Sequence, residues 1–226
     1  LESNITIPKL IQKTIECGYT RVALTDHNVM YGTPAFLRLC KENHIAPIIG
    51  LEADIQYHDA TVPFVLLAKD NKGYLQLMQM SSALNEDPKK VGLEELNACA
   101  THCFIIAYGE GGWIDSELIK EDQEKIIAKL KIMKEEIASF DIALSYQESA
   151  MWKKRNQALK QICHNLGIRT CAMNKISYLT EKENEVCRVL NGIRTNKTLN
   201  DSSLLLPTGR HYLNQDEMKA LFDDDD

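Results

Sequence analysis

A histidine and a glutamate each stand at the end of an apolar run and are of the types that bind divalent metal ions. His27 follows Asp26 after the apolar segment 21–25, and Glu52 ends the next apolar run. Imidazole nitrogen and carboxylate oxygen are common ligands of zinc and related ions. Asp26 or Glu2 could join them from neighbouring loops. The residue types therefore indicate a candidate metal site.

The pair Asp26-His27 also has an interpretation that needs no metal. An aspartate after a strand can form an Asx turn or cap a helix, and the histidine beside it can be held by hydrogen bonds alone. Taken alone, the pair favours this structural interpretation, because a single Asp-His pair is a weak motif. The six histidines form no His-x-His or His-x-x-x-His pair, so a compact metal motif is absent from the sequence.

The elements that must position these residues alternate between strand and helix. Short apolar runs predict buried strands, and amphipathic stretches between them predict helices. We expect strands at 21–25, 47–52, 62–69, 103–108, 141–144 and 168–173, and helices at 6–17, 31–43, 72–85, 121–140, 151–165 and 181–193. This alternation predicts an α/β fold of parallel units. In α/β barrels the ends of such strands carry the active site.

The charge balance excludes a domain that holds nucleic acid by general electrostatics. The formal net charge is −6, and the basic residues are scattered among acids. Binding to a phosphate backbone requires clustered Lys and Arg. One short basic run at 153–155 is interpreted as a solvated helix face.

Cysteine usage and hydropathy indicate a cytoplasmic protein. The chain has seven cysteines and no Cys-x-x-Cys, which favours reduced, buried thiols over disulfides or a zinc cluster. The apolar runs are too short to span a bilayer, and no signal peptide is visible. The chain begins at Leu1 without an initiator Met and ends in the acidic run 223–226, so we expect a domain excised from a longer protein.

Several motifs in a fixed order resemble one family. The segments are 23–32 (ALTDHNVMYG), 46–52 (APIIGLE), 65–74 (VLLAKDNKGY) and 190–199 (LNGIRTNKTL). Together they resemble the polymerase and histidinol phosphatase (PHP) domain at the N-terminus of the bacterial DNA polymerase III alpha subunit. The resemblance covers nearly the whole chain, and its last segment resembles the exit toward the polymerase palm.

The resemblance implies a distorted seven-stranded β/α (TIM-like) barrel, with metal ligands at the carboxyl ends of the strands. We expect this PHP domain at residues 1–200, with its first strand missing upstream, and the start of the connection toward the polymerase region at 201–226. In active members the ligands hold zinc, manganese or iron for phosphoester hydrolysis. Such ions lower the pKa of a bound water and clamp the attacking and leaving oxygens.

Only part of this site is retained when the family's ligands are carried over position by position. The remnant positions are Glu2, His27 and Glu52, and the substituted positions are Pro63, Gln147, Lys175 and Ser177. The family's His-x-His pair would precede Leu1. Lys175 matters most, because an ammonium group opposes the binding of a cation. We hypothesise that Lys175 replaces part of the metal's charge and stabilises Glu2, Glu52 or Asp26.

The resemblance implies a non-catalytic PHP domain of a replicative DNA polymerase, with a structural or partner-docking role in DNA replication. Nucleotide addition would reside downstream in the parent enzyme, and DNA would be bound through that enzyme. The implied partners are the rest of the alpha chain and a proofreading exonuclease subunit, without a membrane. We expect no cofactor in the domain. The alternative is a metal-dependent phosphoesterase, either a 3′–5′ exonuclease or a small-molecule phosphatase, which would need zinc or manganese.

Overall fold

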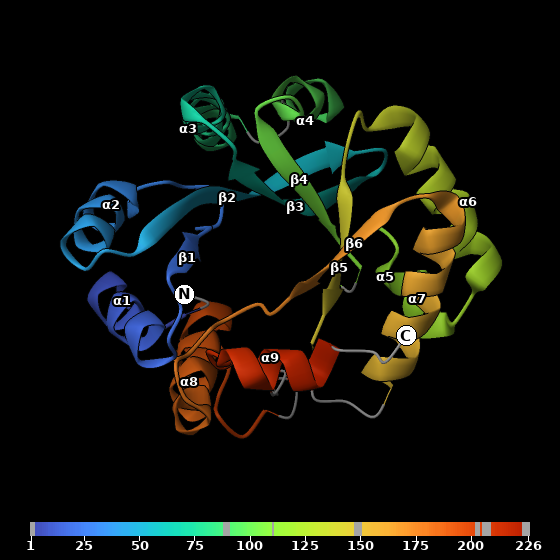
Figure 1. Ribbon diagram of the computed structural model, residues 1–226. Coiled ribbons are helices and arrows are strands. Elements are labelled where there is room, and N and C mark those ends of the chain that lie inside the picture. Colours follow the sequence, from blue (N-terminus) through green and yellow to red (C-terminus); the bar gives the residue numbers. More distant parts are fainter. Residues whose placement is uncertain are drawn as a thin grey trace.

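One curled sheet with helices packed around it makes up the fold (Figure 1). The computed structural model describes residues 3–87, 91–109, 111–146, 151–201, 204 and 209–222. In this part of the chain six strands pair in sequence order, from β1 to β6, as a half-barrel. The strands are β1 (Arg21–Leu24), β2 (Ala46–Tyr57), β3 (Ala60–Ala68), β4 (Cys103–Tyr108), β5 (Asp141–Ser145) and β6 (Arg169–Met173).

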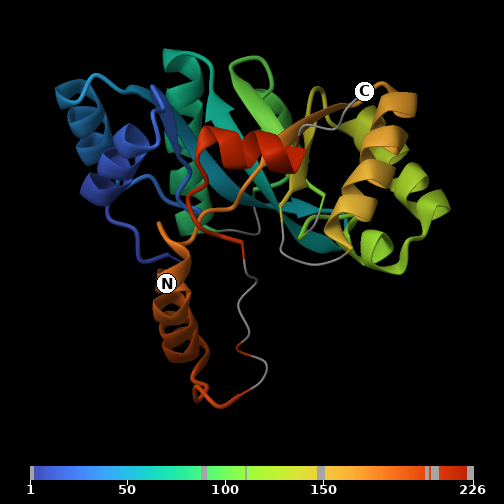
Figure 2. The same cartoon turned by 60° about the horizontal axis from the view of Figure 1, so that its bottom comes forward.

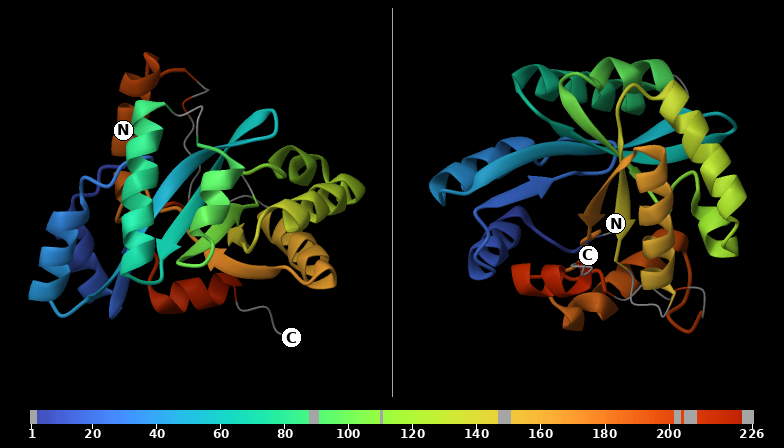
Figure 3. Two further views of the ribbon diagram at one scale, coloured as in Figure 1. Left: turned by 90° about the horizontal axis from the view of Figure 1, so that it is seen from above. Right: turned by 45° about the vertical axis from the view of Figure 1, so that its right-hand side comes forward.

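The helices cover the sheet from one end to the other. They are α1 (Ile7–Glu16), α2 (Thr33–Glu42), α3 (Asn71–Glu86), α4 (Leu93–Cys99), α5 (Asp115–Lys120), α6 (Gln123–Glu136), α7 (Trp152–Leu166), α8 (Asn184–Thr195) and α9 (Gln215–Phe222). In Figure 3, α1 and α2 flank one end of the sheet, α3 and α4 lie over its middle, and α6 and α7 flank the other end. No helix in the described segments is long and apolar enough to cross a membrane.

The sheet is mixed, which corrects the expectation of parallel units throughout. The pairs β1–β2, β4–β5 and β5–β6 are parallel, but β3 runs antiparallel to both β2 and β4. The strand expected to end at Glu52 continues to Tyr57 and turns back at His58, which has a positive φ of 51°. A parallel crossover needs a dozen or more residues, and the link between β2 and β3 is far shorter. A hairpin is therefore the arrangement that this length permits.

Alternation along β2 divides its side chains between the main core and the inside of the curled sheet. Leu51, Ala53 and Ile55 are fully buried in the core that the sheet forms with the surrounding helices. Full burial of a large aliphatic side chain contributes about 1.5–3 kcal/mol. Successive side chains on a strand point to opposite faces, so Glu52 and Asp54 lie on the other face of β2. The pattern that secures the strand also turns two carboxylates toward the interior of the half-barrel.

A smaller core joins the first helices to a segment near the end of the described chain. Leu10, Ile11 and Phe36, from α1 and α2, pack in one cluster with Tyr212. The Tyr212 hydroxyl lies 3.0 Å from Thr14 Oγ1, within hydrogen-bond distance. These contacts fix residues distant in the sequence against α1.

Most of the cysteine side chains are buried, as the sequence predicted. Cys40, Cys99, Cys103, Cys163 and Cys187 are buried, and no disulfide links any cysteine in the described segments. Burial raises the pKa of the Cys163 thiol to about 12, because an apolar environment disfavours the thiolate. At neutral pH this cysteine is therefore a protonated core residue.

Candidate functional site

An ion pair between Lys175 and Glu52 lies at the centre of the candidate site. Lys175 Nζ is 2.8 Å from Glu52 Oε1. Glu52 is only 7% exposed, whereas the Lys175 side chain is 34% exposed. A carboxylate so shielded from water needs a partner for its charge. Of the three acidic residues that the sequence offered as partners for Lys175, the structure places Glu52 in contact with it.

The backbone holds the Asp26-His27-Asn28 segment beside Glu52. After β1 ends, a parallel bridge joins His27 to Glu52. Glu52 N donates to Asp26 O at 3.1 Å, and Asn28 N donates to Glu52 O at 2.8 Å. Gly50 on β2 lets the residue after β1 and the neighbouring strand β3 lie close to β2. A β-carbon on Gly50 would lie 2.7 Å from both Leu66 O and Thr25 Cγ2. Backbone pairing therefore sets the positions of both His27 and Glu52.

His27 lies between two carboxylates. Its Nδ1 is 3.9 Å from Glu52 Oε1, and its Nε2 is 3.0 Å from Asp54 Oδ2. Asn28 completes the cluster: its Nδ2 donates to Asp54 Oδ2 at 3.1 Å, and its Oδ1 accepts from Asp54 N at 2.9 Å. The side chains of Glu52, His27, Asp54 and Asn28 thus form one connected polar group, which Lys175 joins through Glu52.

Asp54 was not among the residues selected from the sequence. Its signal was the spacing of two between Glu52 and Asp54, which places both on one face of a strand. The expected strand ended at Glu52, so the alternation beyond it was not used. Because β2 continues to Tyr57, Asp54 lies one pleat beyond Glu52, within reach of His27.

Asp26 lies toward the start of α2. A β-carbon on Gly32 would lie 3.0 Å from Asp26 Oδ2, and burial raises the pKa of the Asp26 carboxyl. Gly32 precedes α2, and no side chain caps that helix. The interpretation that Asp26 caps a helix is therefore wrong. The interpretation that His27 is held by hydrogen bonds is confirmed.

The substituted positions have different surroundings. Pro63 lies in β3 directly opposite Asp54 in the antiparallel register. Ser177 is buried, and its backbone N donates to Arg210 O at 2.9 Å, while its O accepts from Asn4 N at 3.3 Å. Glu2 and Gln147, which were predicted as a remnant and a substituted position, lie outside the described residues. The structure thus brings together His27, Glu52 and Lys175 of the predicted set.

Lys175 weakens the attraction that the carboxylates around Glu52 would have for a divalent ion. At an effective dielectric constant near 20, a divalent ion about 4 Å from an ammonium group is repelled by about 8 kcal/mol. One carboxylate at the same distance attracts it by a similar amount. Lys175 therefore cancels the attraction of about one carboxylate. Within the segments that the structure describes, no three His, Cys, Asp or Glu side chains are placed as a metal-binding group.

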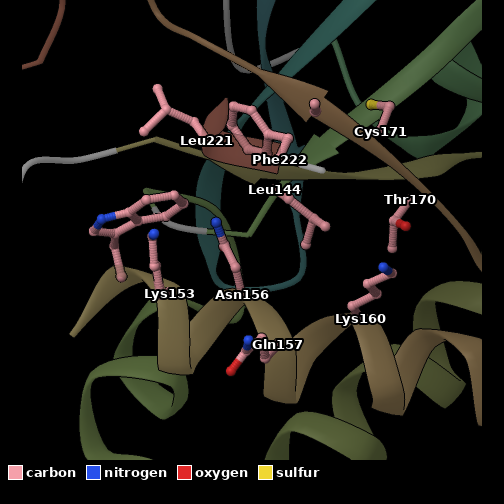
Figure 4. A pocket seen from close by; sticks show the side chains of 11 residues that line it. Leu144, Lys153, Asn156, Gln157, Lys160, Thr170, Cys171, Leu221 and Phe222 are labelled. Atoms are coloured by element: carbon pink, nitrogen blue, oxygen red, sulfur yellow. The ribbon is translucent and has the colours of Figure 1, made fainter. Parts of the chain in front are cut away.

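A separate pocket lies between α7, β6 and α9 (Figure 4). Its volume is about 160 Å³, and Lys153, Asn156 and Lys160 line it on the α7 side, with Leu221 and Phe222 from α9. Neither carboxylate nor imidazole is among its lining residues. It therefore offers no acid–base pair comparable to the cluster around Glu52.

Residues 1–149 match the profile of the family described as PHP domain. The chain is 28% identical over 198 residues to DNA polymerase III subunit alpha of Halalkalibacterium halodurans, covering 86% of this chain and 18% of that protein. It is 29% identical over 207 residues to the same subunit of Bacillus subtilis, covering 89% and 18%. The chain thus spans less than a fifth of the length of these relatives.

Solved structures share the fold at low sequence identity. An amidohydrolase from Chromobacterium violaceum has a TM-score of 0.50 and 11% identity, over 75% of this chain and 81% of that one. A protein of Bifidobacterium adolescentis, provisionally assigned as a metal-dependent phosphoesterase, has a TM-score of 0.50 and 10% identity, over 76% and 82%. Fold and sequence thus agree, and the chain belongs to the PHP domain family, with homology to DNA polymerase III alpha subunits over most of its length.

Proposed function

We propose that this chain is the N-terminal PHP domain of a bacterial replicative DNA polymerase, and that its metal site is vestigial. The homology to polymerase alpha subunits over most of the chain supports the parent enzyme. In this proposal residues 1–200 belong to a seven-stranded PHP barrel whose first strand lies upstream of Leu1, and residues 201–226 begin the connection to the polymerase region. The protein acts in the cytoplasm, and DNA is bound by the parent enzyme.

The ion pair between Lys175 and Glu52 carries the proposal of a vestigial site. Hydrolysis in this family would rest on ions that generate a metal-bound water and stabilise the reacting oxygens. Here an ammonium group lies 2.8 Å from the most buried carboxylate of the cluster. An ammonium group in this place opposes the divalent ion that such chemistry requires, and this supports the proposal of a vestigial site.

The same ion pair supports a structural role for the cluster. Glu52 lies on β2, and Lys175 follows the end of β6, four strands further along the sheet order. Their contact therefore crosses the interior of the curled sheet and joins segments that no strand pairing among the described residues connects. A fixed half-barrel of this kind would give the polymerase a rigid module, on which a proofreading exonuclease subunit could also dock.

A degradation assay separates this proposal from the phosphoesterase alternative. The full-length polypeptide is given primed DNA labelled near the primer 3′ end, with magnesium and nucleotides, and then with manganese or zinc and no nucleotides. We expect nucleotide incorporation, and no 3′–5′ degradation that depends on His27. The matched control for His27→Ala is His164→Ala, at an exposed position on α7. Degradation lost in His27→Ala but kept in His164→Ala would establish the hydrolase instead.

A further inference from the structure

The pocket between α7, β6 and α9 has a cationic side that α7 supplies (Figure 4). Its lining residues on α7 include two lysines and two amides, at a spacing of three, four and seven residues: Lys153, Asn156, Gln157 and Lys160. Residues at this spacing lie on one face of a helix. Thr170 adds a hydroxyl group from β6. No acidic side chain is among the described residues that line the pocket, so its lining is positive in a chain whose formal net charge is −6.

Apolar side chains from three elements complete the pocket. They are Leu144 on β5, Trp152 at the start of α7, and Leu221 and Phe222 at the end of α9. Figure 2 shows α9 running across the half-barrel toward α7, which brings its last residues to the pocket. The centroid of the Trp152 ring lies 5.0 Å from that of Tyr146 and 6.0 Å from that of Phe222. Because Trp152 is only 8% exposed, these contacts hold its ring in place before any ligand binds.

Two of the polar side chains on α7 are restrained as well. Asn156 Nδ2 donates to Ser145 O at 3.0 Å, which ties the amide to the end of β5. Lys153 Nζ lies 5.7 Å from the centroid of the Trp152 ring, within the range of a cation–π contact. Side chains that are ordered in advance lose less conformational entropy when a ligand binds. The pocket is therefore arranged in advance for a ligand.

The size and charge of the pocket limit the class of ligand. Its volume is about 160 Å³, and a cavity of about 150 Å³ holds one benzene molecule. The apolar part of a ligand is thus about one ring in size. Ammonium groups bind phosphate and carboxylate groups through charge-assisted hydrogen bonds and repel cations. The lining therefore suits an anionic group joined to a small apolar body.

We infer that the pocket between α7, β6 and α9 is a binding site for a small organic anion. Lys153 and Lys160 bind its phosphate or carboxylate group, and its apolar body packs against Trp152 and Phe222. The pocket shares no lining residue with the cluster around Glu52, whose carboxylates would repel such a ligand. The inference needs only the described residues of the three elements, so it stands apart from the proposed function.

Fluorine NMR on the full-length polypeptide tests the inference. The ligands are para-fluorophenyl phosphate and para-fluorobenzoate, which carry the two anionic groups, and para-fluorophenol, which is neutral at neutral pH. A chelator removes metal ions, so that only binding is observed. At least one anion should bind with a dissociation constant about tenfold or more below that of the phenol, because a hydrogen bond to a charged group contributes that much. The tighter of the two anions identifies the charged group of the ligand.

Substitutions on α7 locate the binding. Lys153→Gln and Lys160→Gln should each weaken binding of the tighter anion by at least about fivefold, since each removes an ammonium group from the lining. The matched control is Lys154→Gln. Lys154 is on the same helix, but it pairs with Glu121 and is not a lining residue, so its loss should change the affinity by less than about twofold. Melting temperatures show that each variant is folded.

The apolar body is tested by competition and by Phe222→Ala. The tighter anion without its fluorine should displace the labelled ligand at lower concentration than inorganic phosphate or formate, which carry the charge without the ring. Phe222→Ala should weaken binding of the labelled anion and leave that of the bare ion unchanged.

Four results would overturn the site. Equal affinity for para-fluorophenol would show that the lysines add nothing to binding, and equal effects of the three lysine variants would reduce it to general electrostatic attraction. Equal competition by the bare ion would show that the apolar side chains are not used. No line broadening of either anion at millimolar concentration would remove the site altogether.

Discussion

Replacing Lys175 by methionine is expected to lower the free energy of unfolding by about 2 kcal/mol. The substitution leaves the Glu52 carboxylate, 7% exposed, without the ammonium 2.8 Å away. Losing one partner of a fully buried pair costs about 3–5 kcal/mol, and the partial exposure of Lys175 moderates that cost. The melting temperature of a domain of this size should fall by about 4–8 °C, as measured by calorimetry.

An exposed lysine–glutamate pair provides the matched control. Lys154 Nζ lies 2.7 Å from Glu121 Oε2, and both side chains are exposed. Lys154→Met should therefore cost less than about 0.5 kcal/mol. Adding Glu52→Gln to Lys175→Met should recover part of the loss, because it removes the uncompensated charge. Equal effects of Lys175→Met and Lys154→Met would show that Lys175 does not stabilise Glu52.

Lys175→Asp should destabilise the chain more strongly, by about 3–5 kcal/mol in the absence of metal. A third carboxylate would then lie close to Glu52 and Asp54, and like charges at that distance repel each other. These groups are the ligand types that zinc accepts. A ligand that binds only the folded state at 100 times its dissociation constant adds about 2.7 kcal/mol, so zinc should raise the melting temperature of this variant.

The zinc effect has its own control in Lys175→Met. That variant loses the ammonium group but gains no ligand, so zinc should leave its melting temperature unchanged. Rescue of both variants to the same extent would mean that Lys175 alone had excluded the ion and that the remaining donors suffice. Rescue of neither would mean that a carboxylate at position 175 cannot complete a site with the cluster around Glu52.

The sequence predicted most elements of the fold because their patterns are local. The apolar run 103–108 coincides with β4, and the expected helix 151–165 differs from α7 by one residue at each end. The expected helix 121–140 was too long. Glu121 adopts a positive φ of 56° after α5, and α6 begins only after Asp122, whose carboxylate accepts from Lys125 N. Aspartate is a typical N-cap residue, so Asp122 marks the start of α6. The spacing of the apolar residues alone did not reveal this start.

The site was harder to predict because it depends on contacts far apart in the sequence. Glu52 and Lys175 are separated by 123 positions, and nothing local indicates their contact. The family resemblance drew attention to position 175, but the choice among three acidic partners required the curled sheet. Asp54 was missed because the hairpin from β2 to β3 was not foreseen. Register and sheet closure thus determine the site, and they follow from tertiary packing.

Metal content is the most direct test of the claim that Lys175 has taken the place of a metal ion. The protein, with any native residues upstream of Leu1, is equilibrated with zinc and manganese, desalted and analysed by mass spectrometry. The account predicts less than about a tenth of an equivalent of metal per chain, since an intact site would hold zinc tightly through desalting. Close to one equivalent, lost on His27→Ala and kept on His164→Ala, would contradict it.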